Sequence, residues 1–425
     1  MRIENIRLEK TGDRARVTAT VLWEDCGRPT QEIFFETVEK FSDGLSCSPH
    51  AFLVACIMPA MYFGEERVSI EGEICPVLKD GLMTVMHWMR FWWYEPDRRL
   101  VKIEAKTRSG LPLPRTPERA GVFFSGGIDA LATLRANRLN YPLEHPGSIK
   151  DGLLVCGLEI RDPRIFGYVL DSVSVLAEDA GLTLVPIYTN IRSLGPENNN
   201  EFWLKFWTDE FQGATFSAIA HAFAKRLTKV SINSDYDIPN VVPYSSHPLV
   251  EPNYSSGDLR IRFEGITLSR FEKTKLVAGW DLALQHLRVC NRTDLYQPGM
   301  LNCGKCEKCV RTMLALLALG VLEKTSVFPI HDVNEELVMT AVKVMPPGEF
   351  SAFYAELMVP LEEKGRHDLV RAIKQKVAEY HQSERRKKQR KVFIEPILKF
   401  DRKHLGGNLG KVKRLVYPWG GIWNK

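Results

Sequence analysis

The sequence predicts an α/β protein in which helices cover both faces of a parallel sheet, with an α+β domain before this unit and a helical extension after it. Three observations lead to this fold class. Between residues 121 and 233, short apolar runs of strand length alternate with helical segments, which is typical of a parallel sheet. Strand and helix patterns are mixed before residue 108, and only helical patterns follow residue 328. The predicted units are 1–108, 119–328 and 329–425.

The N-terminal unit is expected to be a small accessory domain. Arg14 to Glu24 alternates polar and apolar residues, as a half-buried strand does. Ser109 to Glu118 contains three prolines and a glycine, which predicts a linker. The other elements expected before this linker are strands at 31–38, 67–71 and 100–105 and helices at 49–63 and 77–94.

The central and C-terminal units follow the same reasoning. The expected central strands are 121–124, 152–158, 182–188 and 229–233. The expected central helices are 129–139, 167–180 and 211–227. The expected C-terminal helices are 334–344, 349–363 and 367–382.

The composition is that of an ordinary globular protein, with 44% hydrophobic and 26% charged residues and a net charge of +5. Charges stand near the N-terminus where a secretion signal would have its apolar core, and no apolar run reaches the ~20 residues of a membrane-spanning helix. The nine cysteines are unevenly distributed, which favours reduced thiols over a disulfide framework. We therefore expect a cytoplasmic protein without a membrane span.

The segment Ser125-Gly-Gly-Ile-Asp129 lies between an expected strand and an expected helix. Because Gly126 and Gly127 lack side chains, backbone N–H groups there can surround phosphate oxygens, and the helix directs its positive end at them. Ser125 adds a hydroxyl donor, and the Asp129 carboxylate can hold Mg²⁺ or orient donors. A tight strand-to-helix turn without a ligand is the alternative.

The stretch VFFSGGIDALATL resembles the S-G-G-x-D-S signature of the PP-loop ATP pyrophosphatase superfamily. This resemblance implies the HUP/PP-loop type of fold, binding of the pyrophosphate part of ATP at this loop, and adenylation of a substrate oxygen. The second serine of the signature is replaced by Ala130, which removes one hydroxyl from the phosphate site.

Four cysteines, Cys290, Cys303, Cys306 and Cys309, have a spacing that suits a tetrahedral zinc site. Nearby Lys and Arg residues, namely Arg288, Arg292, Lys305, Lys308 and Arg311, offset the negative charge of the thiolates. An iron–sulfur cluster and four free buried thiols are the alternatives. With four protein ligands, a zinc ion here would be structural.

The order of the glycine loop and the late cysteine motif resembles the 7-cyano-7-deazaguanine synthase (QueC) family. Leu268 to Val277 and Ser231 to Asp235 extend the resemblance, which covers about residues 121–320. It implies a ligase that converts a carboxyl group to an amide or nitrile with ATP and a nitrogen nucleophile. Tyr244 to Glu251 departs from the pattern of that family, so a substrate of its own is expected for this chain.

Several polar residues between the two motifs are candidates for the site. Arg270 and Lys273 can neutralise the departing pyrophosphate, or be ordinary solvated charges on a helix. Asp235, His247 and Glu251 are candidates for substrate contact, with His247 as an acid–base group or a loop histidine bonded to the backbone.

The tail from Glu384 to Arg414 carries twelve Lys or Arg residues and three acidic residues. It is expected either to contact RNA or an anionic membrane surface, or to pack back onto the body. The glycine-rich stretch 406–411 follows no strand and is expected to be a turn.

These observations predict an ATP- and Mg²⁺-dependent enzyme with structural zinc that forms AMP and pyrophosphate. It would adenylate a carboxylate or carbonyl oxygen of an acceptor for attack by nitrogen. The alternatives are a PP-loop enzyme that modifies tRNA and, from another class, a non-catalytic adenine-nucleotide-binding module.

Overall fold

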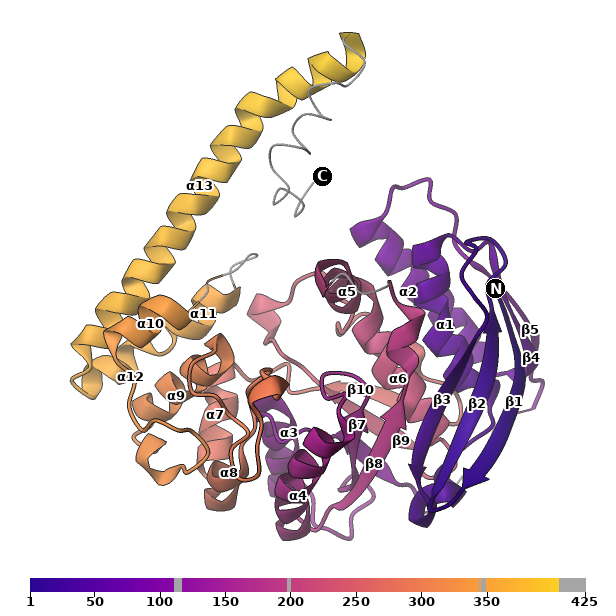
Figure 1. Cartoon of the computed structure of the whole chain (residues 1–425), viewed down its shortest axis with the longest axis horizontal. Helices are drawn as coiled ribbons and strands as arrows, with labels where there is room; N and C mark the ends of the chain where they lie inside the picture. The colour runs from indigo at the N-terminus through magenta and orange to yellow at the C-terminus, as the bar shows by residue number, and fades with distance from the viewer. Residues whose placement is uncertain (111–116, 197–199, 343, 345–348, 405–425) are drawn as a thin grey trace.

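The structure is a computed structural model that describes residues 1–425 except 111–116, 197–199, 343, 345–348 and 405–425. In this part of the chain, ten strands form one sheet in the order β10-β9-β6-β7-β8-β3-β2-β1-β4-β5 (Figure 1). The strands are β1 (Arg2–Thr11), β2 (Arg14–Leu22), β3 (Gln31–Val38), β4 (Arg67–Ile74), β5 (Lys102–Thr107), β6 (Ala120–Phe123), β7 (Ile149–Cys156), β8 (Thr183–Thr189), β9 (Lys229–Asn233) and β10 (Arg260–Glu264). Neighbouring strands run parallel except at β1–β2, β2–β3 and β3–β8, which confirms an α/β fold with a mostly parallel sheet.

Helices of the described chain cover both faces of this sheet, and those near the C-terminus pack on other helices. The helices are α1 (Pro49–Phe63), α2 (Pro76–Trp93), α3 (Ile128–Asn140), α4 (Pro163–Asp179), α5 (Asn200–Phe206), α6 (Gln212–Ala222), α7 (Arg270–Ala278), α8 (Asp281–His286), α9 (Glu307–Ala318), α10 (Glu335–Ala341), α11 (Glu349–Ala355), α12 (Met358–Glu363) and α13 (His367–His404). A π-helical segment, η3 (Trp207–Phe211), joins α5 to α6.

The sheet separates two hydrophobic cores, because successive strand residues point to opposite faces. On β6, Phe123 packs into the core that contains α1, α2 and α6, whereas Val122 belongs to the core that contains α3, α4 and α9. Leu153 and Leu154 on β7 divide between the cores in the same way. The first core also contains the N-terminal strands, so residues before and after the linker are buried together.

Helix α1 shows how the sequence sets one of these layers. Ser48 caps the helix by accepting a hydrogen bond from the backbone N–H of His50, and Pro49 occupies the first turn, where proline is tolerated. The helix ends at Gly64, which has a φ of +83°. Nearly every residue of α1 is buried, as its uniformly apolar sequence requires, and the helix packs against α6 and β4.

Strands β3 and β8 join the predicted N-terminal unit to the central unit within one sheet. They pair antiparallel, with Phe35 opposite Thr189 and Thr37 opposite Ile187. Two hydroxyl groups reinforce the pairing, because Thr37 donates to the carbonyl of Pro186 and Thr189 donates to the carbonyl of Phe34, both at 2.7 Å.

Several elements differ from the sequence expectation. The charged strand β1 was not expected, and its backbone pairs with β2 and β4 while Arg7 forms ion pairs with Glu9 and Glu32 on the exposed side. The short strand β10 was also missed. The helix expected at 349–363 is divided into α11 and α12, and the last helix continues beyond residue 382.

Helix α13 packs against α10 and α12 at its beginning and then extends away from the body (Figure 1). Arg385 and Arg386 on it are exposed. The glycine-rich stretch 406–411 and the rest of the tail lie outside the described residues. Among the described helices, none combines the length and the apolar character that crossing a bilayer requires.

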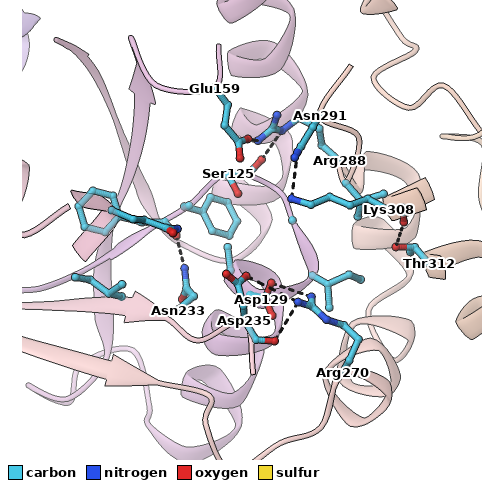
Figure 2. A pocket seen from close by; sticks show the side chains of 18 of the residues that line it. Ser125, Asp129, Glu159, Asn233, Asp235, Arg270, Arg288, Asn291, Lys308 and Thr312 are labelled. Atoms are coloured by element: carbon cyan, nitrogen blue, oxygen red, sulfur yellow. Dashed lines mark hydrogen bonds and ion pairs between the residues drawn. The ribbon is translucent and has the colours of Figure 1, made fainter. Parts of the chain in front are cut away.

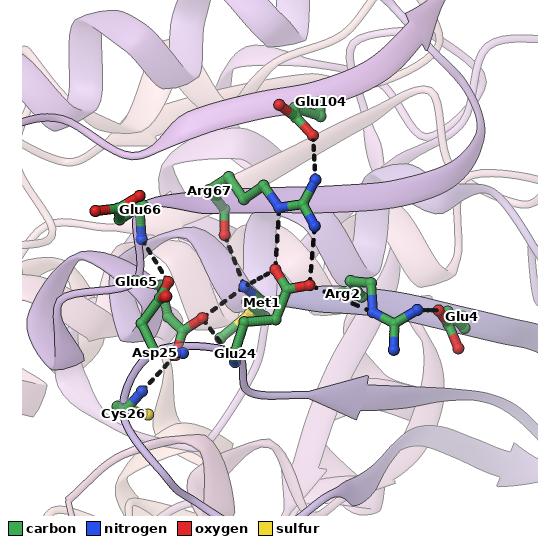
Figure 3. A network of polar contacts seen from close by, with 10 residues as sticks. All are labelled: Met1, Arg2, Glu4, Glu24, Asp25, Cys26, Glu65, Glu66, Arg67 and Glu104. Carbon is green, nitrogen blue, oxygen red and sulfur yellow. Dashed lines mark hydrogen bonds and ion pairs between the residues drawn. The ribbon is translucent and has the colours of Figure 1, made fainter.

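A buried carboxylate fixes the start of the N-terminal strands (Figure 3). Glu65 is fully buried at its side chain and lies 2.5 Å from the α-amino group of Met1. It also accepts hydrogen bonds from the backbone N–H groups of Glu24, Asp25 and Cys26 at 3.0–3.2 Å. Glu65 thus organises the turn that follows β2.

We expect Glu65→Gln to lower the free energy of unfolding by about 2 kcal/mol at pH 7, because hydrogen bonds to a charged acceptor are replaced by bonds to a neutral amide. Burial alone would raise the pKa of Glu65, but the Met1 amino group and the backbone donors hold it below its usual value. The stabilisation is therefore present above pH ~4.5 and lost as the pH falls through the lower folded-state value.

Urea unfolding at pH 7 and at pH 3 measures this effect. The difference from the unmodified protein should shrink at the lower pH. The exposed neighbour Glu66 provides the control, since Glu66→Gln should change little. Equal unfolding free energies for both variants at pH 7 would contradict the role of Glu65.

Candidate functional site

The glycine loop lies at the point where the strand order reverses. Strand β6 has β7 on one side and β9 on the other, so the chain leaves β6 toward β8 and later returns to add β9 and β10. In open α/β sheets, ligands bind at the carboxyl ends of the strands at such a point. Residues 125–129 follow β6 there and lead directly into α3.

Gly126 gives the loop its shape. Its φ of +76° lies in the left-handed region that other residues rarely adopt, and a Cβ atom would stand 3.1 Å from Cγ2 of Val173. Arg288 holds the loop from behind. Its backbone N–H donates to the carbonyl of Gly126, and its Nε donates to the carbonyl of Ser125, both at 2.9 Å. The N–H groups of the first turn of α3 have no intrahelical partner, because no helical turn precedes them, and they can receive an anion.

Asp129 connects the loop to α7. Its Oδ2 accepts from Nη1 of Arg270 at 2.8 Å, and its Oδ1 lies 3.5 Å from Nζ of Lys273. Lys273 also donates to the carbonyl of Ser234 at 2.6 Å. The position of both cations is set by the start of α7, where Ser269 and Glu272 form a reciprocal capping box.

The local charges keep Asp129 ionised. Burial would raise the pKa of its carboxyl group, but Arg270 and Lys273, with a smaller contribution from Lys308, hold it below the usual value. Burial lowers the pKa of Lys273, and the Asp129 carboxylate opposes that effect. Ion pairing with Asp129 therefore supports the charged forms on both sides.

A cavity of about 300 Å³ opens in front of the loop (Figure 2). Ser125, Gly127 and Asp129 line it on one side, and Asn233 and Asp235 line it after β9. Its charged lining residues are Asp129, Glu159, Asp235, Arg270, Arg288, Lys308 and Arg311.

Three basic residues from the segments around the cysteines also line the cavity. Lys308 donates to Oδ1 of Asn291 at 3.2 Å, and Arg288 lies 3.8 Å from Glu159 (Figure 2). Arg311 forms an ion pair with Glu307 at 3.4 Å. We call Arg288, Lys308 and Arg311 the cationic wall.

The apolar part of the cavity is aromatic. Phe123 packs against Phe216 with ring centres 4.6 Å apart, and Phe216 contacts Trp207. Phe353 of α11 stacks on Tyr236 at 5.9 Å and lies beneath the guanidinium group of Arg270. The C-terminal helical segment therefore contributes to the cavity, which the sequence analysis did not predict.

Asn233 presents a polar group beside these rings. Its Nδ2 donates to the carbonyl of Phe123 at 2.8 Å, while its buried Oδ1 has no hydrogen-bond partner among the described residues. Asp235 is 42% exposed and accepts from the hydroxyl group of Tyr244 at 3.1 Å. These two residues can orient a ligand that donates hydrogen bonds.

The four predicted cysteines come together. The sulfur atoms of Cys290, Cys303, Cys306 and Cys309 all lie within 4.8 Å of one another. The Cys303–Cys309 and Cys306–Cys290 sulfur distances are 3.9 and 3.7 Å. Thiolates bound at ~2.3 Å to a tetrahedral zinc ion lie about 3.8 Å apart, so the geometry fits zinc. A metal such as zinc can be held here.

Two predicted substrate residues lie outside the cavity lining. His247 is buried, accepts a hydrogen bond from the backbone N–H of Leu249 and packs its ring against Trp92 at 4.9 Å. Glu251 is fully buried and accepts from Ser246 at 2.7 Å, and burial raises its pKa to about 8. Both residues pack among residues of the first core, whereas Asp235 lines the cavity.

That the residues of the cationic wall line this cavity was not predicted from the sequence. The sequence analysis assigned Arg288, Lys308 and Arg311 to charge compensation at the cysteines, and the structure shows that they also line the cavity. Their closeness in sequence to Cys290 and Cys309 was the available signal. Asn233 stands at the end of a correctly predicted strand, where side chains of neighbouring strands meet.

Comparison of the chain with protein-family models, with curated proteins and with solved structures gave no match.

Proposed function

We propose that this protein is an ATP-dependent ligase of the PP-loop type that forms AMP and pyrophosphate. The observation that carries this proposal is the glycine loop at the reversal of strand order, next to a cavity whose lining includes Arg270, Arg288, Lys308 and Arg311. Such a cavity suits a polyphosphate, because backbone donors and cations both bind phosphate oxygens.

The phosphate end of ATP would lie against Ser125, Gly126 and Gly127, with Arg270 beside it. These donors would stabilise the charge that develops on the departing pyrophosphate. The buried Lys273 would act through its ion pair with Asp129. Asp129 would keep both cations in place, since it pairs with each of them.

Mg²⁺ would accompany ATP, because this ion is usually held by one or two carboxylates together with substrate phosphates. Oδ1 of Asp129 fits this role in part. It accepts no hydrogen bond among the described residues and has only the 3.5 Å ion pair with Lys273. Asp235 is the second carboxylate on this side of the cavity.

The acceptor would occupy the aromatic part of the cavity near Asn233 and Asp235. Its carboxylate or carbonyl oxygen would attack the α-phosphorus, and the bond from that phosphorus to the bridging oxygen of pyrophosphate would break. A nitrogen nucleophile would then attack the activated carbon and release AMP. Nitrogen is favoured over sulfur as the donor, because the described lining residues include no cysteine that could carry sulfur.

Product analysis tests this function. The protein would be incubated with Mg²⁺-ATP, ammonium and a panel of aromatic and aliphatic carboxylates, and nucleotides would be separated by chromatography. We expect AMP and pyrophosphate in equal amounts with a competent acceptor. Carboxylate labelled with ¹⁸O should transfer one labelled oxygen to AMP.

ADP and phosphate as products would contradict the proposal. Formation of AMP only in the presence of RNA would favour an enzyme that modifies tRNA, for which the exposed basic residues of α13 are the structural argument. Tight ATP binding without turnover for any acceptor would favour a nucleotide-binding module.

A further inference from the structure

The cationic wall and the four-cysteine centre are built from the same two segments of chain. Arg288 stands two residues before Cys290, and Asn291 directly follows Cys290. Lys308 lies between Cys306 and Cys309 at the start of α9. In each segment, cysteine side chains form the cysteine centre, and neighbouring side chains line the cavity.

The two segments are joined at two places. One is the cysteine centre itself, where Sγ of Cys306 lies 3.7 Å from Sγ of Cys290. The other is the hydrogen bond from Lys308 to Asn291 at 3.2 Å. A metal ion bound to all four sulfurs would fix both segments relative to each other, because it replaces weak thiol contacts with coordination bonds.

The segment that contains Cys290 also contacts the glycine loop, residues 125–129, through Arg288. Arg288 binds the carbonyls of Ser125 and Gly126 through its side chain and its backbone. The position of the loop and the position of Lys308 thus depend on one short stretch of chain, residues 288–291.

Lys308 is suited to receive an anion. Its ammonium group contacts the neutral amide oxygen of Asn291, and it lines the same cavity as Asp129 (Figure 2). Lys305 is a natural comparison, because it flanks the same cysteines but is exposed and does not line the cavity.

We propose that the four-cysteine centre is a positioning element of the polyphosphate site, and that Lys308 is the phosphate-binding residue that it holds in place. The choice of pyrophosphate as the ligand rests on the proposed function, whereas the coupling between metal and anion does not. The centre would then set anion affinity as well as stability.

The first experiment measures the binding of inorganic pyrophosphate with Mg²⁺ to the full-length zinc-loaded protein by calorimetry. We expect Lys308→Met to weaken binding on the order of tenfold, as the loss of one charge-assisted hydrogen bond implies. Lys305→Met should bind like the unmodified protein, and Lys308→Arg should recover most of the affinity. Zinc content and melting temperature should be the same in all three variants. Equal affinities of Lys308→Met and Lys305→Met would overturn the proposal.

The second experiment measures whether pyrophosphate binding changes the environment of the metal in the folded protein. Cobalt(II) in place of zinc gives visible absorption bands from its thiolate ligands. Pyrophosphate should shift these bands in the unmodified protein and in Lys305→Met but not in Lys308→Met. Bands that do not respond in the unmodified protein would refute the coupling.

The two proposals fail separately. If pyrophosphate binds in this metal-coupled manner but ATP yields ADP, the proposed function is wrong and the positioning role stands. If AMP and pyrophosphate are formed but the variants bind pyrophosphate equally, the positioning role is wrong and the function stands.

Discussion

Asp129→Asn is expected to lower the rate of AMP formation on the order of 100-fold, the size seen when a group that stabilises developing charge is lost. The substitution keeps the shape of the side chain but removes the charge that pairs with Arg270 and Lys273. Lys273 is almost fully buried, so it would lose its charged partner in a place with little access to water. Both cations would then be displaced from the loop, and Mg²⁺ would lose a carboxylate.

Initial rates of AMP and pyrophosphate formation at saturating ATP measure this effect. Asp162→Asn is the control, because Asp162 caps α4 by accepting a hydrogen bond from the backbone N–H of Arg164 and does not line the cavity. The pKa of Asp129 lies below its usual value, so it stays charged as the pH falls through the range where free carboxylates titrate. Its loss should therefore be felt at every pH from 5 to 9. Full activity of Asp129→Asn would refute the assignment of the loop.

Cys306→Ser is expected to lower the zinc content from about one ion per chain and to reduce the free energy of unfolding by more than about 3 kcal/mol. This value is roughly a quarter of the apparent binding free energy of a structural zinc ion. Cys306 also precedes the first residue of α9, so the loss of its bond to the metal would release the start of that helix. The buried helix carries much of the second core, and its displacement would reach α10 and α12.

Elemental analysis and urea unfolding measure the two effects. Cys47→Ser is the matched control, because Cys47 is a free and exposed cysteine far from the cluster in sequence. A visible absorption band typical of an iron–sulfur cluster would refute zinc as the natural metal. A metal-free variant with unchanged stability would refute a structural role.

The local structures that the sequence predicted well depend on residues that are adjacent in the chain. The loop from Ser125 to Asp129 needs only a strand, two glycines and a helix start, all of which are local. The cysteines are similar, because three of them lie within seven residues and one turn of chain brings them together. The α/β class followed from the spacing of apolar runs.

The features that were missed depend on contacts between distant residues. Arg288 binds Ser125 across 163 positions. Arg270 was predicted as a site residue, but its ion pair with Asp129, across 141 positions, was not. Phe353, in the aromatic part of the cavity, comes from α11, and the sequence of that helix contains no motif that indicates a binding site. His247 and Glu251 were placed near the site because they lie between the motifs, yet their segment turns toward Trp92 and Ser217.

The antiparallel pairing of β3 with β8 covers an edge of the central strands. None of the described residues that line the cavity comes from before Phe123, so the first hundred residues touch no ligand in the proposed reaction. They do cover an edge. A fragment beginning after residue 118 would present the backbone groups of β8 unpaired, and open edges of this kind recruit strands from other molecules. The N-terminal strands therefore protect the part of the chain that would carry out the chemistry from aggregation through this edge.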